Sequence, residues 1–275
     1  MCPINASFYT LIVVKLLRES LIHMHGALAF GFVVVFLSFL VLWQRASCVS
    51  KIHLVGDVLF VFAHPDDEAM FFSPLLDYVR RHGLNAHFLC LSNGNYSGLG
   101  TVREKELVAS AEYFGVNRRS VRVVDHPDLQ DGPDNLWNTE IVQREVLSYL
   151  HSVKDIRTVI TFDHRGVSSH ANHVAVYEGV LLAKKNLPPG ILFLSLHTRD
   201  LLEKYVGILS TVGYTVGIHR CGGRRNHVIL IPPTSLFTSF SAMRKHKTQL
   251  VWFRYLFVWF SSYSYVNEVK ELGVA

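Results

Sequence analysis

Beyond residue 56, the chain alternates short apolar runs with longer segments in which apolar residues recur every three or four positions. Short runs rich in β-branched and aromatic residues predict buried strands, and the periodic segments predict helices. The expected strands span 57–63, 86–91, 121–124, 158–162, 191–196 and 227–231. The expected helices span 69–82, 103–114, 139–150 and 173–185. Strands that alternate with helices form βαβ units, so we expect an α/β domain with a Rossmann-like, mostly parallel sheet and helices on both faces.

A long uncharged segment precedes this domain. Residues 26–43 carry no charge, and extended back to Leu21 the segment is 23 residues long. As a helix it can cross a ~30 Å hydrocarbon layer. A cleaved signal peptide has a shorter apolar core and a small-residue cleavage site, which residues 43–47 do not provide. We expect one transmembrane helix and four regions, namely an extension at 1–20, an anchor at 21–45, a linker at 46–56 and a main domain at 57–275.

Composition and charge exclude several classes of protein. Hydrophobic residues make up 49% of the 275 positions and charged residues 18%, so the chain has enough apolar material to fold. The net charge of +5 contains no block of lysine and arginine, so we expect no nucleic-acid binding. The four cysteines form no C-x-x-C pair, which favours reduced thiols in a reducing compartment.

Polar clusters follow four of the predicted strands. They are His64-Pro65-Asp66-Asp67-Glu68, Ser92-Asn93-Gly94-Asn95, Asp125-His126-Pro127-Asp128 with 129–132, and Asp163-His164-Arg165-Gly166 with 168–173. Ligands of open α/β sheets bind outside the carboxyl ends of the strands, so we expect these clusters to converge. Imidazole and carboxylate together suit zinc, with manganese, iron or nickel as alternatives. His64 and Asp67 share one tight turn, and His170 or His173 is the candidate third ligand.

The same residues also have ordinary structural interpretations. Asp66 or Asp67 could cap a helix, and His170 and His173 could be unremarkable residues at a helix N-terminus. Glu68 faces away from the turn and is expected to anchor the loop. Three further polar residues are taken as loop residues rather than ligands: His126, Asp128 and His164.

The ordered set of motifs resembles the PIG-L/LmbE-like deacetylase family. The matching segments are 63–68 and 170–173, with further likeness at 92–94, Arg103, 106–107, 129–132, 166–168 and 249–254. The anchor and the aromatic tail make the likeness greatest to the eukaryotic branch. That branch converts N-acetylglucosaminyl-phosphatidylinositol to glucosaminyl-phosphatidylinositol and acetate, the second step of GPI-anchor biosynthesis. The resemblance implies that residues 57–275 are a catalytic deacetylase domain.

The resemblance also implies roles for five residues. Zinc would be held by His64, Asp67 and His173. Asp66 would be the general base, and His170 would stabilise the transition state. This assignment agrees with the chemistry, because a zinc ion acidifies its bound water and a carboxylate beside a ligand can accept the proton of that water.

Candidates for substrate binding come from the other matching motifs. They are Asn93, Arg103 and Asp131. Arg103 could contact a substrate phosphate, or it could pair with Glu106 on its own helix. Ser168 stands where some bacterial relatives carry a tyrosine, which leaves any extra proton donor unidentified.

Two features concern the membrane. Residues 250–260 are dense in aromatics but, with Arg254 inside, too short and too charged to span. A buried terminal helix is the favoured interpretation, and a membrane-facing surface that admits a lipid is the alternative. Asn95-Tyr96-Ser97 is a glycosylation sequon in an expected active-site loop, where a glycan would obstruct the cleft. This favours a cytosolic catalytic domain, and the resemblance likewise implies the endoplasmic reticulum membrane with that domain facing the cytosol.

There are three rival functions. One is the same zinc chemistry on another N-acetylglucosamine conjugate, and another is a catalytically silent, membrane-tethered protein that binds a lipid or sugar. The third is a metal phosphoesterase, which usually needs two metals and more carboxylates. Binding alone does not require a base beside a metal, so the presence of all five proposed catalytic and ligand residues favours an enzyme.

Overall fold

The computed structural model describes residues 25–26, 29–47, 52–132, 135–216 and 226–273. Within these residues, seven strands form one sheet in the order β3-β2-β1-β4-β5-β7-β6. The strands are β1 (Asp57–Phe62), β2 (Ala86–Cys90), β3 (Val121–Val123), β4 (Ile156–Phe162), β5 (Leu192–Leu196), β6 (Asn226–Leu230) and β7 (Val266–Glu271). Strands β1 to β5 pair in parallel, whereas β7 is antiparallel to both β5 and β6. The predicted α/β fold with a mostly parallel sheet is confirmed.

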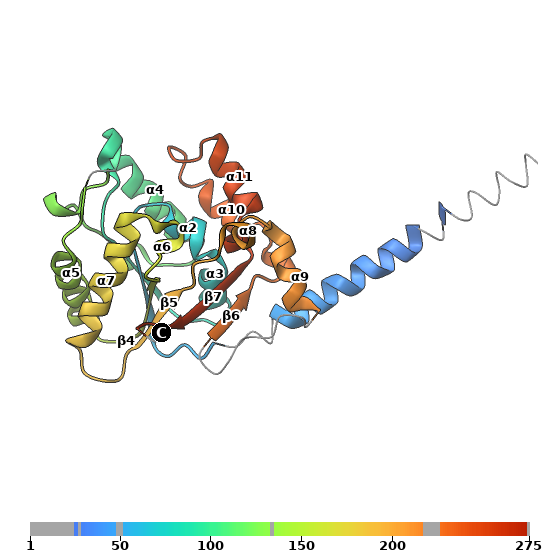
Figure 1. Ribbon diagram of the computed structural model, residues 1–275, viewed down its shortest axis with the longest axis horizontal. Helices are drawn as coiled ribbons and strands as arrows, with labels where there is room; N and C mark the ends of the chain where they lie inside the picture. Colours follow the sequence, from blue (N-terminus) through green and yellow to red (C-terminus); the bar gives the residue numbers. More distant parts are fainter. Residues whose placement is uncertain (1–24, 27–28, 48–51, 133–134, 217–225, 274–275) are drawn as a thin grey trace, which may run out of the picture.

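Helices cover both faces of the sheet (Figure 1). Two long helices, α5 (Thr139–Ser152) and α7 (Ala171–Lys185), pack together on one face. Helices α3 (Ser73–Arg81), α4 (Gly100–Tyr113) and α10 (Thr238–Met243) lie on the other. The shorter helices are α2 (Asp67–Phe71), α6 (Gly166–Ser169), α8 (Leu201–Lys204), α9 (Ser210–Thr215) and α11 (Trp252–Phe260). Strand β1 lies between β2 and β4 and is buried on both faces, which explains its continuous apolar run.

Two elements differ from the sequence-based expectations. The helix expected at 69–82 is broken at Phe72 into α2 and α3, because Pro74 stands in the first turn of α3, where its missing N–H is tolerated. Strand β7 was not expected at all, because polar residues interrupt its sequence. One of them, Asn267, is fully buried and binds the backbone of α2 and α3, accepting from the Leu75 N–H and donating to the Phe71 carbonyl.

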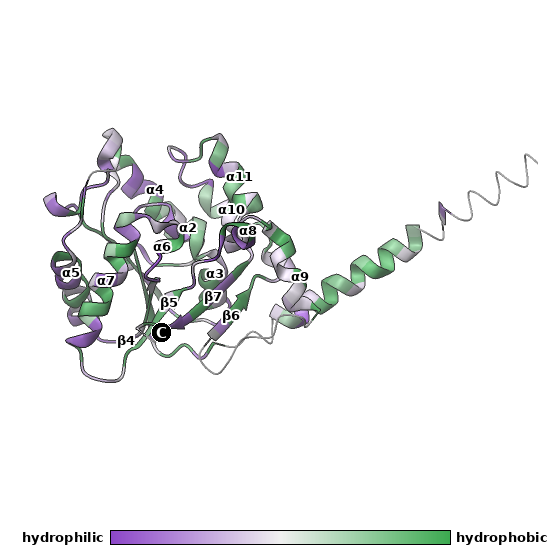
Figure 2. Cartoon of the chain, in the orientation of Figure 1, coloured by the Kyte–Doolittle hydropathy of each residue, from purple (hydrophilic) through white to green (hydrophobic). Residues whose placement is uncertain are grey.

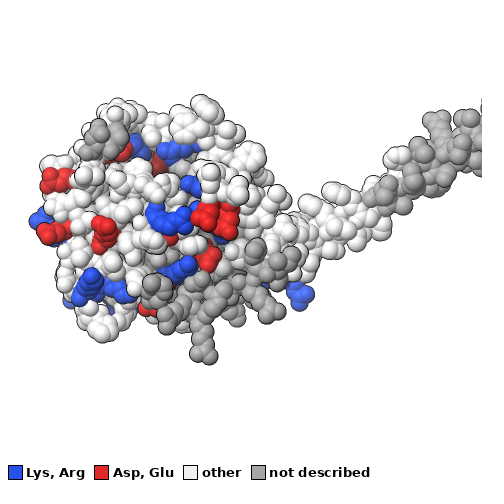
Figure 3. Space-filling view, viewed as in Figure 1, with Lys and Arg blue, Asp and Glu red and all other residues white. Residues whose placement is uncertain are grey.

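The N-terminal helix described, Ala29–Ser47, is apolar and long enough to cross a membrane by length and composition. Figure 2 shows that most of its residues are hydrophobic, and Figure 3 shows that it projects from the main domain almost without charges. At its domain end, Trp43 is buried against Val228, Ile231 and Tyr265. The helix continues two residues beyond the predicted anchor, 21–45. The start of that anchor and the extension 1–20 fall outside the described residues, so the four boundaries stay predictions.

The structure describes one of the four cysteines, Cys90. Cys90 is a free, buried thiol at the end of β2, in line with the expected reduced state. Burial raises its pKa well above the usual value, so the thiol is held in its neutral, unreactive form. The other three cysteines, Cys2, Cys48 and Cys221, lie outside the described residues.

Candidate metal-dependent active site

The polar clusters meet where the strand order reverses. Strand β1 has β2 on one side and β4 on the other, and the carboxyl ends of β1 and β4 flank a crevice at this switch point. His64 follows β1, and Asp67 is the first residue of α2. After β4, the chain passes through α6 and reaches His170, the N-cap of α7, and His173 in its first turn. Residues a hundred positions apart in the sequence therefore share one site.

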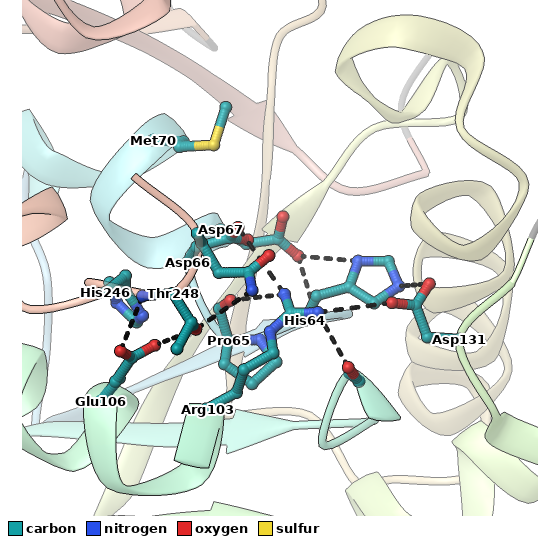
Figure 4. A network of polar contacts seen from close by, with 12 residues as sticks. His64, Pro65, Asp66, Asp67, Met70, Arg103, Glu106, Asp131, His246 and Thr248 are labelled. Carbon is teal, nitrogen blue, oxygen red and sulfur yellow. Dashed lines mark hydrogen bonds and ion pairs between the residues drawn. The ribbon is translucent and has the colours of Figure 1, made fainter. Parts of the chain in front are cut away.

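Three side chains lie close enough to hold one ion. One ligand atom from each of His64, Asp67 and His173 lies within 4.8 Å of the other two, and all three residues are buried. His173 Nε2 is 3.3 Å from Asp67 Oδ1. His64 Nδ1 is 3.8 Å from Asp67 Oδ2, and Figure 4 shows these two side chains beside each other. Two imidazole nitrogens and one carboxylate oxygen are a donor set that zinc accepts while keeping a position for water. Of the two histidines that the sequence left open, the structure brings His173 within ligand distance of Asp67.

Backbone contacts orient these donors before any ion binds. Asp67 Oδ2 accepts the N–H groups of Ala63 and His64 at 3.0 and 2.8 Å, which leaves Oδ1 directed at His173. His173 Nδ1 donates to the Gly166 carbonyl at 3.1 Å, so its Nε2 is the acceptor nitrogen. The Phe162 ring stacks on His173 at 4.1 Å and 8°. Such contacts fix the tautomer and ring orientation of a metal-binding histidine, and the residues present fit a zinc ion.

Burial and neighbouring charges favour the deprotonated forms of His64 and Asp67. Burial is the main cause that lowers the pKa of His64 to about 4, and Asp67 only partly opposes it. Burial also lowers the pKa of His170. For Asp67, burial raises the pKa, but His173 and His64 outweigh burial and hold it well below its usual range. At neutral pH the site therefore offers a neutral His64 imidazole and an ionised Asp67 carboxylate, the forms that bind metals.

Asp66 occupies a strained position beside the ligands. Its φ is 125°, a conformation that residues with a Cβ rarely adopt, and such strain concentrates at functional sites. The buried carboxylate lies 2.9 Å from Nη1 of Arg254 and 3.6 Å from Nη2 of Arg103. Burial raises the pKa of Asp66, and the two arginines oppose that rise. Its backbone N–H donates to Glu68 Oε2, which holds the turn.

Glu68 anchors this turn from below, as expected. The side chain is fully buried, and Oε1 accepts from Ser110 Oγ and from His246 Nε2, each at 2.6 Å. Burial lowers the pKa of His246, but the adjacent Glu68 carboxylate outweighs burial and raises it. The pair therefore fixes α2 to α4 and to the segment after α10.

The substrate-binding candidates fall in different places. Arg103 donates to the carbonyls of Gly94 and Pro65 at 3.0 and 2.9 Å, and Glu106 instead accepts from Thr248, so the expected alternative of an Arg103–Glu106 pair is wrong. Asp131 joins the site, 3.4 Å from His64 Nε2 and 3.5 Å from Arg103 Nη1. Asn93 is buried beside Gly100 and is not one of the residues that line the cavity.

A cavity of about 750 Å³ opens onto the site. Its lining includes the metal-ligand candidates with Asp66, Asp131 and His170, and a further part of the lining comes from α11. The favoured prediction of a buried terminal helix is wrong, because only Val258 of α11 is buried. Trp252 is 75% exposed, and Phe253, Leu256 and Phe260 are about half exposed. The alternative, a membrane-facing surface that admits a lipid, stays a prediction; the structure shows apolar side chains of α11 that are exposed and line the cavity.

Sequence reasoning missed several residues of the site. Arg254 was noted as the end of a segment that resembles the family and as a charge that prevents residues 250–260 from spanning, but it was given no role in the site, although an arginine inside an aromatic run was the available signal. Asn172 contacts His64 Nε2 at 3.0 Å through its side-chain amide. Trp137 meets the His64 ring edge-on at 5.8 Å. His246 gave no signal in the sequence, because its contact with Glu68 joins segments 178 residues apart.

Comparison with known proteins identifies the family of the chain. The family model described as PIG-L, GlcNAc-PI de-N-acetylase, matches residues 59–184. A probable N-acetylglucosaminyl-phosphatidylinositol de-N-acetylase of Schizosaccharomyces pombe is 40% identical over 79% of this chain and 87% of its own length. The chain belongs to the PIG-L family. The N-acetylglucosaminyl-phosphatidylinositol de-N-acetylase of Bos taurus is 34% identical over 84% of this chain and 90% of its own.

The fold of the chain is similar to that of solved deacetylase structures. The N,N'-diacetylchitobiose deacetylase from Pyrococcus horikoshii has a TM-score of 0.52 at 17% identity, covering 82% of this chain and 84% of its own. A deacetylase of teicoplanin biosynthesis has a TM-score of 0.53 at 15% identity, covering 80% of this chain and 100% of its own. At these identities the likeness establishes a shared fold, which agrees with the sheet described above.

Proposed function

We propose that this chain is a zinc-dependent deacetylase that converts N-acetylglucosaminyl-phosphatidylinositol to glucosaminyl-phosphatidylinositol and acetate in GPI-anchor biosynthesis. The observation that carries the proposal is the cavity, which joins the His64, Asp67 and His173 group with Asp66 at one end to exposed apolar side chains of α11 at the other. A sugar amide and a lipid tail need such a combination of surfaces. Relatives with the corresponding names over most of their length support the same substrate.

His64, Asp67 and His173 would hold the zinc ion. When bound, the ion would supply Lewis acidity toward the acetyl carbonyl and acidify water. Asp66 would accept the proton of the attacking water at its carboxylate and later return it to the departing amine. Arg254 and Arg103 keep this carboxylate in place without binding the metal-ligand group, which separates the base from the ligands.

His170 is suited to stabilise the oxygen that gains negative charge. Its Nδ1 accepts the Asn172 N–H at 3.3 Å, so a neutral ring carries its proton on Nε2. That N–H is then free to donate to the acetyl oxygen in the transition state. The ring centroid of His170 lies 4.7 Å from that of His173 and 5.2 Å from that of His64, beside the candidate metal position.

Membrane attachment and orientation belong to the same proposal. The helix Ala29–Ser47 would anchor the domain in the endoplasmic reticulum membrane, and the exposed face of α11 would contact the lipid substrate. A cytosolic orientation is supported by Asn95, since its neighbours Gly94, Tyr96 and Ser97 line the cavity and a glycan there would block it. Sugar found on Asn95 in the native protein would reverse the orientation.

The test is acetate release from the glycolipid in detergent micelles. We expect activity that a chelator abolishes and zinc restores, and that Asp66→Asn lowers at least 100-fold while the protein still binds zinc. Asp155→Asn is the matched control, because Asp155 is exposed at the opposite end of the sheet. Full activity of Asp66→Asn would remove the base assignment. Equal turnover of unrelated N-acetylglucosamine conjugates would favour the broader deacetylase, and no turnover of any would favour a silent binding protein.

A further inference from the structure

Lys204, at the end of α8, is a buried cation in the cavity. Its side chain lines the cavity, and only 7% of the residue is exposed. Arg103 and Arg254, the other strong bases in the lining, each face the Asp66 carboxylate. Among the described residues, no carboxylate lies within 4 Å of the Lys204 ammonium group. A buried charge is costly without a partner, so this ammonium group is suited to an anion that the cavity admits.

The contacts that Lys204 does make are weak and leave the ammonium group available. Its Nζ donates to the Val167 carbonyl at 3.4 Å and lies 5.6 and 5.8 Å from the ring centroids of Tyr205 and Phe257. The backbone carbonyl satisfies one of its three donors. Burial lowers the pKa of Lys204, as expected for a cation that lacks a counter-charge.

Lys204 lies between the two ends of the cavity. Val167 follows Gly166, whose carbonyl orients His173, so the ammonium group contacts the same turn that positions a metal-ligand candidate. On its other side, the Phe257 ring of α11 touches Phe71 at 5.6 Å, and Phe71 touches His173 at 5.7 Å. The Lys204 ammonium group therefore contacts the turn that positions His173 on one side and the Phe257 ring of α11 on the other.

This place matches one group of the glycolipid. In N-acetylglucosaminyl-phosphatidylinositol, the phosphodiester lies between the inositol ring and the diacylglycerol, one ring beyond the sugar that carries the amide. We propose that Lys204 binds this phosphodiester and thereby sets the distance between the lipid and the amide. The inference rests on the proposed function and adds a specificity-determining residue to it. An ammonium-to-phosphate contact is a charge-assisted hydrogen bond of the strong class.

The first test compares substrates with and without phosphate. In neutral maltoside micelles, Lys204→Met is expected to raise KM for the glycolipid about 10- to 100-fold with little change in kcat. For an alkyl N-acetylglucosaminide, which lacks phosphate, its KM should equal that of the wild type. Lys204→Arg should recover most of the loss, and Lys185→Met, at an exposed site at the end of α7, should have no effect. Equal losses on both substrates would overturn the proposal in favour of a structural role.

A binding assay on protein from which a chelator has removed the metal gives a readout that does not need activity. The wild type should bind phosphatidylinositol with a Kd at least tenfold lower than that of Lys204→Met. The two proteins should bind diacylglycerol with equal Kd. If the difference appears only after phosphatidylserine is added, the ligand is a bilayer headgroup and the proposal is wrong. Failure of the proposed function would be seen separately, as absent acetate release by the wild type. Wild-type turnover without any phosphate-dependent effect of Lys204→Met would refute this inference alone.

Discussion

The contact between His246 and Glu68 allows a stability prediction that can be worked out from the structure. Both side chains are fully buried, and Nε2 of His246 donates to Oε1 of Glu68 at 2.6 Å. The substitution His246→Leu removes the donor and leaves the carboxylate with Ser110 Oγ and the Asp66 N–H. Leucine is apolar and of similar size, so the main change is the lost partner rather than a cavity.

Two estimates bound the effect on the free energy of unfolding. A hydrogen bond to a charged group is worth about 1.5–3 kcal/mol. Removal of one member of a buried ion pair costs about 3–5 kcal/mol, because the other charge stays buried. Glu68 keeps two hydrogen bonds, so we expect a loss near the lower end of the second range, about 3 kcal/mol. In a domain of this size, that corresponds to a Tm lower by about 6–12 °C.

The effect has a defined pH dependence. The folded-state pKa of His246 is raised above the usual 6.5 because the Glu68 carboxylate outweighs burial. Protonated His246 therefore stabilises the fold fully below pH 6.5, and this contribution is lost as the pH rises through the raised value. The difference in stability between wild type and His246→Leu should thus be larger at pH 6 than at pH 9.

Thermal unfolding of the full chain in detergent measures both quantities. His53→Leu is the matched control, because His53 is exposed, and it should change stability by less than about 0.5 kcal/mol. Adding Glu68→Gln to His246→Leu should recover part of the loss, since it removes the unpaired buried charge. A Tm of His246→Leu equal to that of the wild type, or a gap that widens toward pH 9, would refute the reasoning.

Three other predictions follow from single contacts. Gly166 has φ +55°, and a Cβ there would lie 2.9 Å from His173 Cβ, so Gly166→Ala should weaken zinc affinity at least tenfold by equilibrium dialysis; unchanged affinity would refute the orienting role. Trp252→Ser should lower turnover of vesicle-bound glycolipid roughly tenfold but leave a water-soluble substrate unaffected; equal losses would argue against a lipid contact. Tyr263→Phe removes the acceptor of the Arg199 N–H and should lower unfolding stability by about 1–2 kcal/mol in thermal melts; an unchanged Tm would contradict it.

Strands β1, β2, β4 and β5 of the parallel half were predictable because each is largely a buried apolar run. Strand β1, for example, has neighbours on both sides and helices on both faces, so its sequence has no polar face to obscure it. Strand β7 could not be recognised this way. Its Asn267 is tolerated in the core only because it binds the backbone at Leu75 and Phe71, and these partners are close in space but not in sequence.

The site shows the same division between local and distant information. His64 and Asp67 could be paired from the sequence because they share one turn. The third ligand could be narrowed to His170 or His173, because both follow another strand of the same sheet edge, and only the family resemblance pointed to His173. The environment of Asp66 could not be predicted from the sequence, because it depends on where α11 and α4 place Arg254 and Arg103. A guanidinium group 188 residues away decides how the carboxylate is held, and no sequence spacing encodes that contact.

Helix α11 explains why the run at 250–260 combines aromatic residues with one arginine. Arg254 points inward to Asp66, and the same short helix exposes Trp252 and Phe260. A helix that presented only apolar residues inward would leave Asp66 with a single, more distant arginine and a carboxylate less firmly held. A helix that exposed only polar residues would remove the apolar wall of the cavity. Placing both kinds of residue on one element makes contact with the lipid and support of the proposed base depend on the same packing, so displacement of α11 should impair both together.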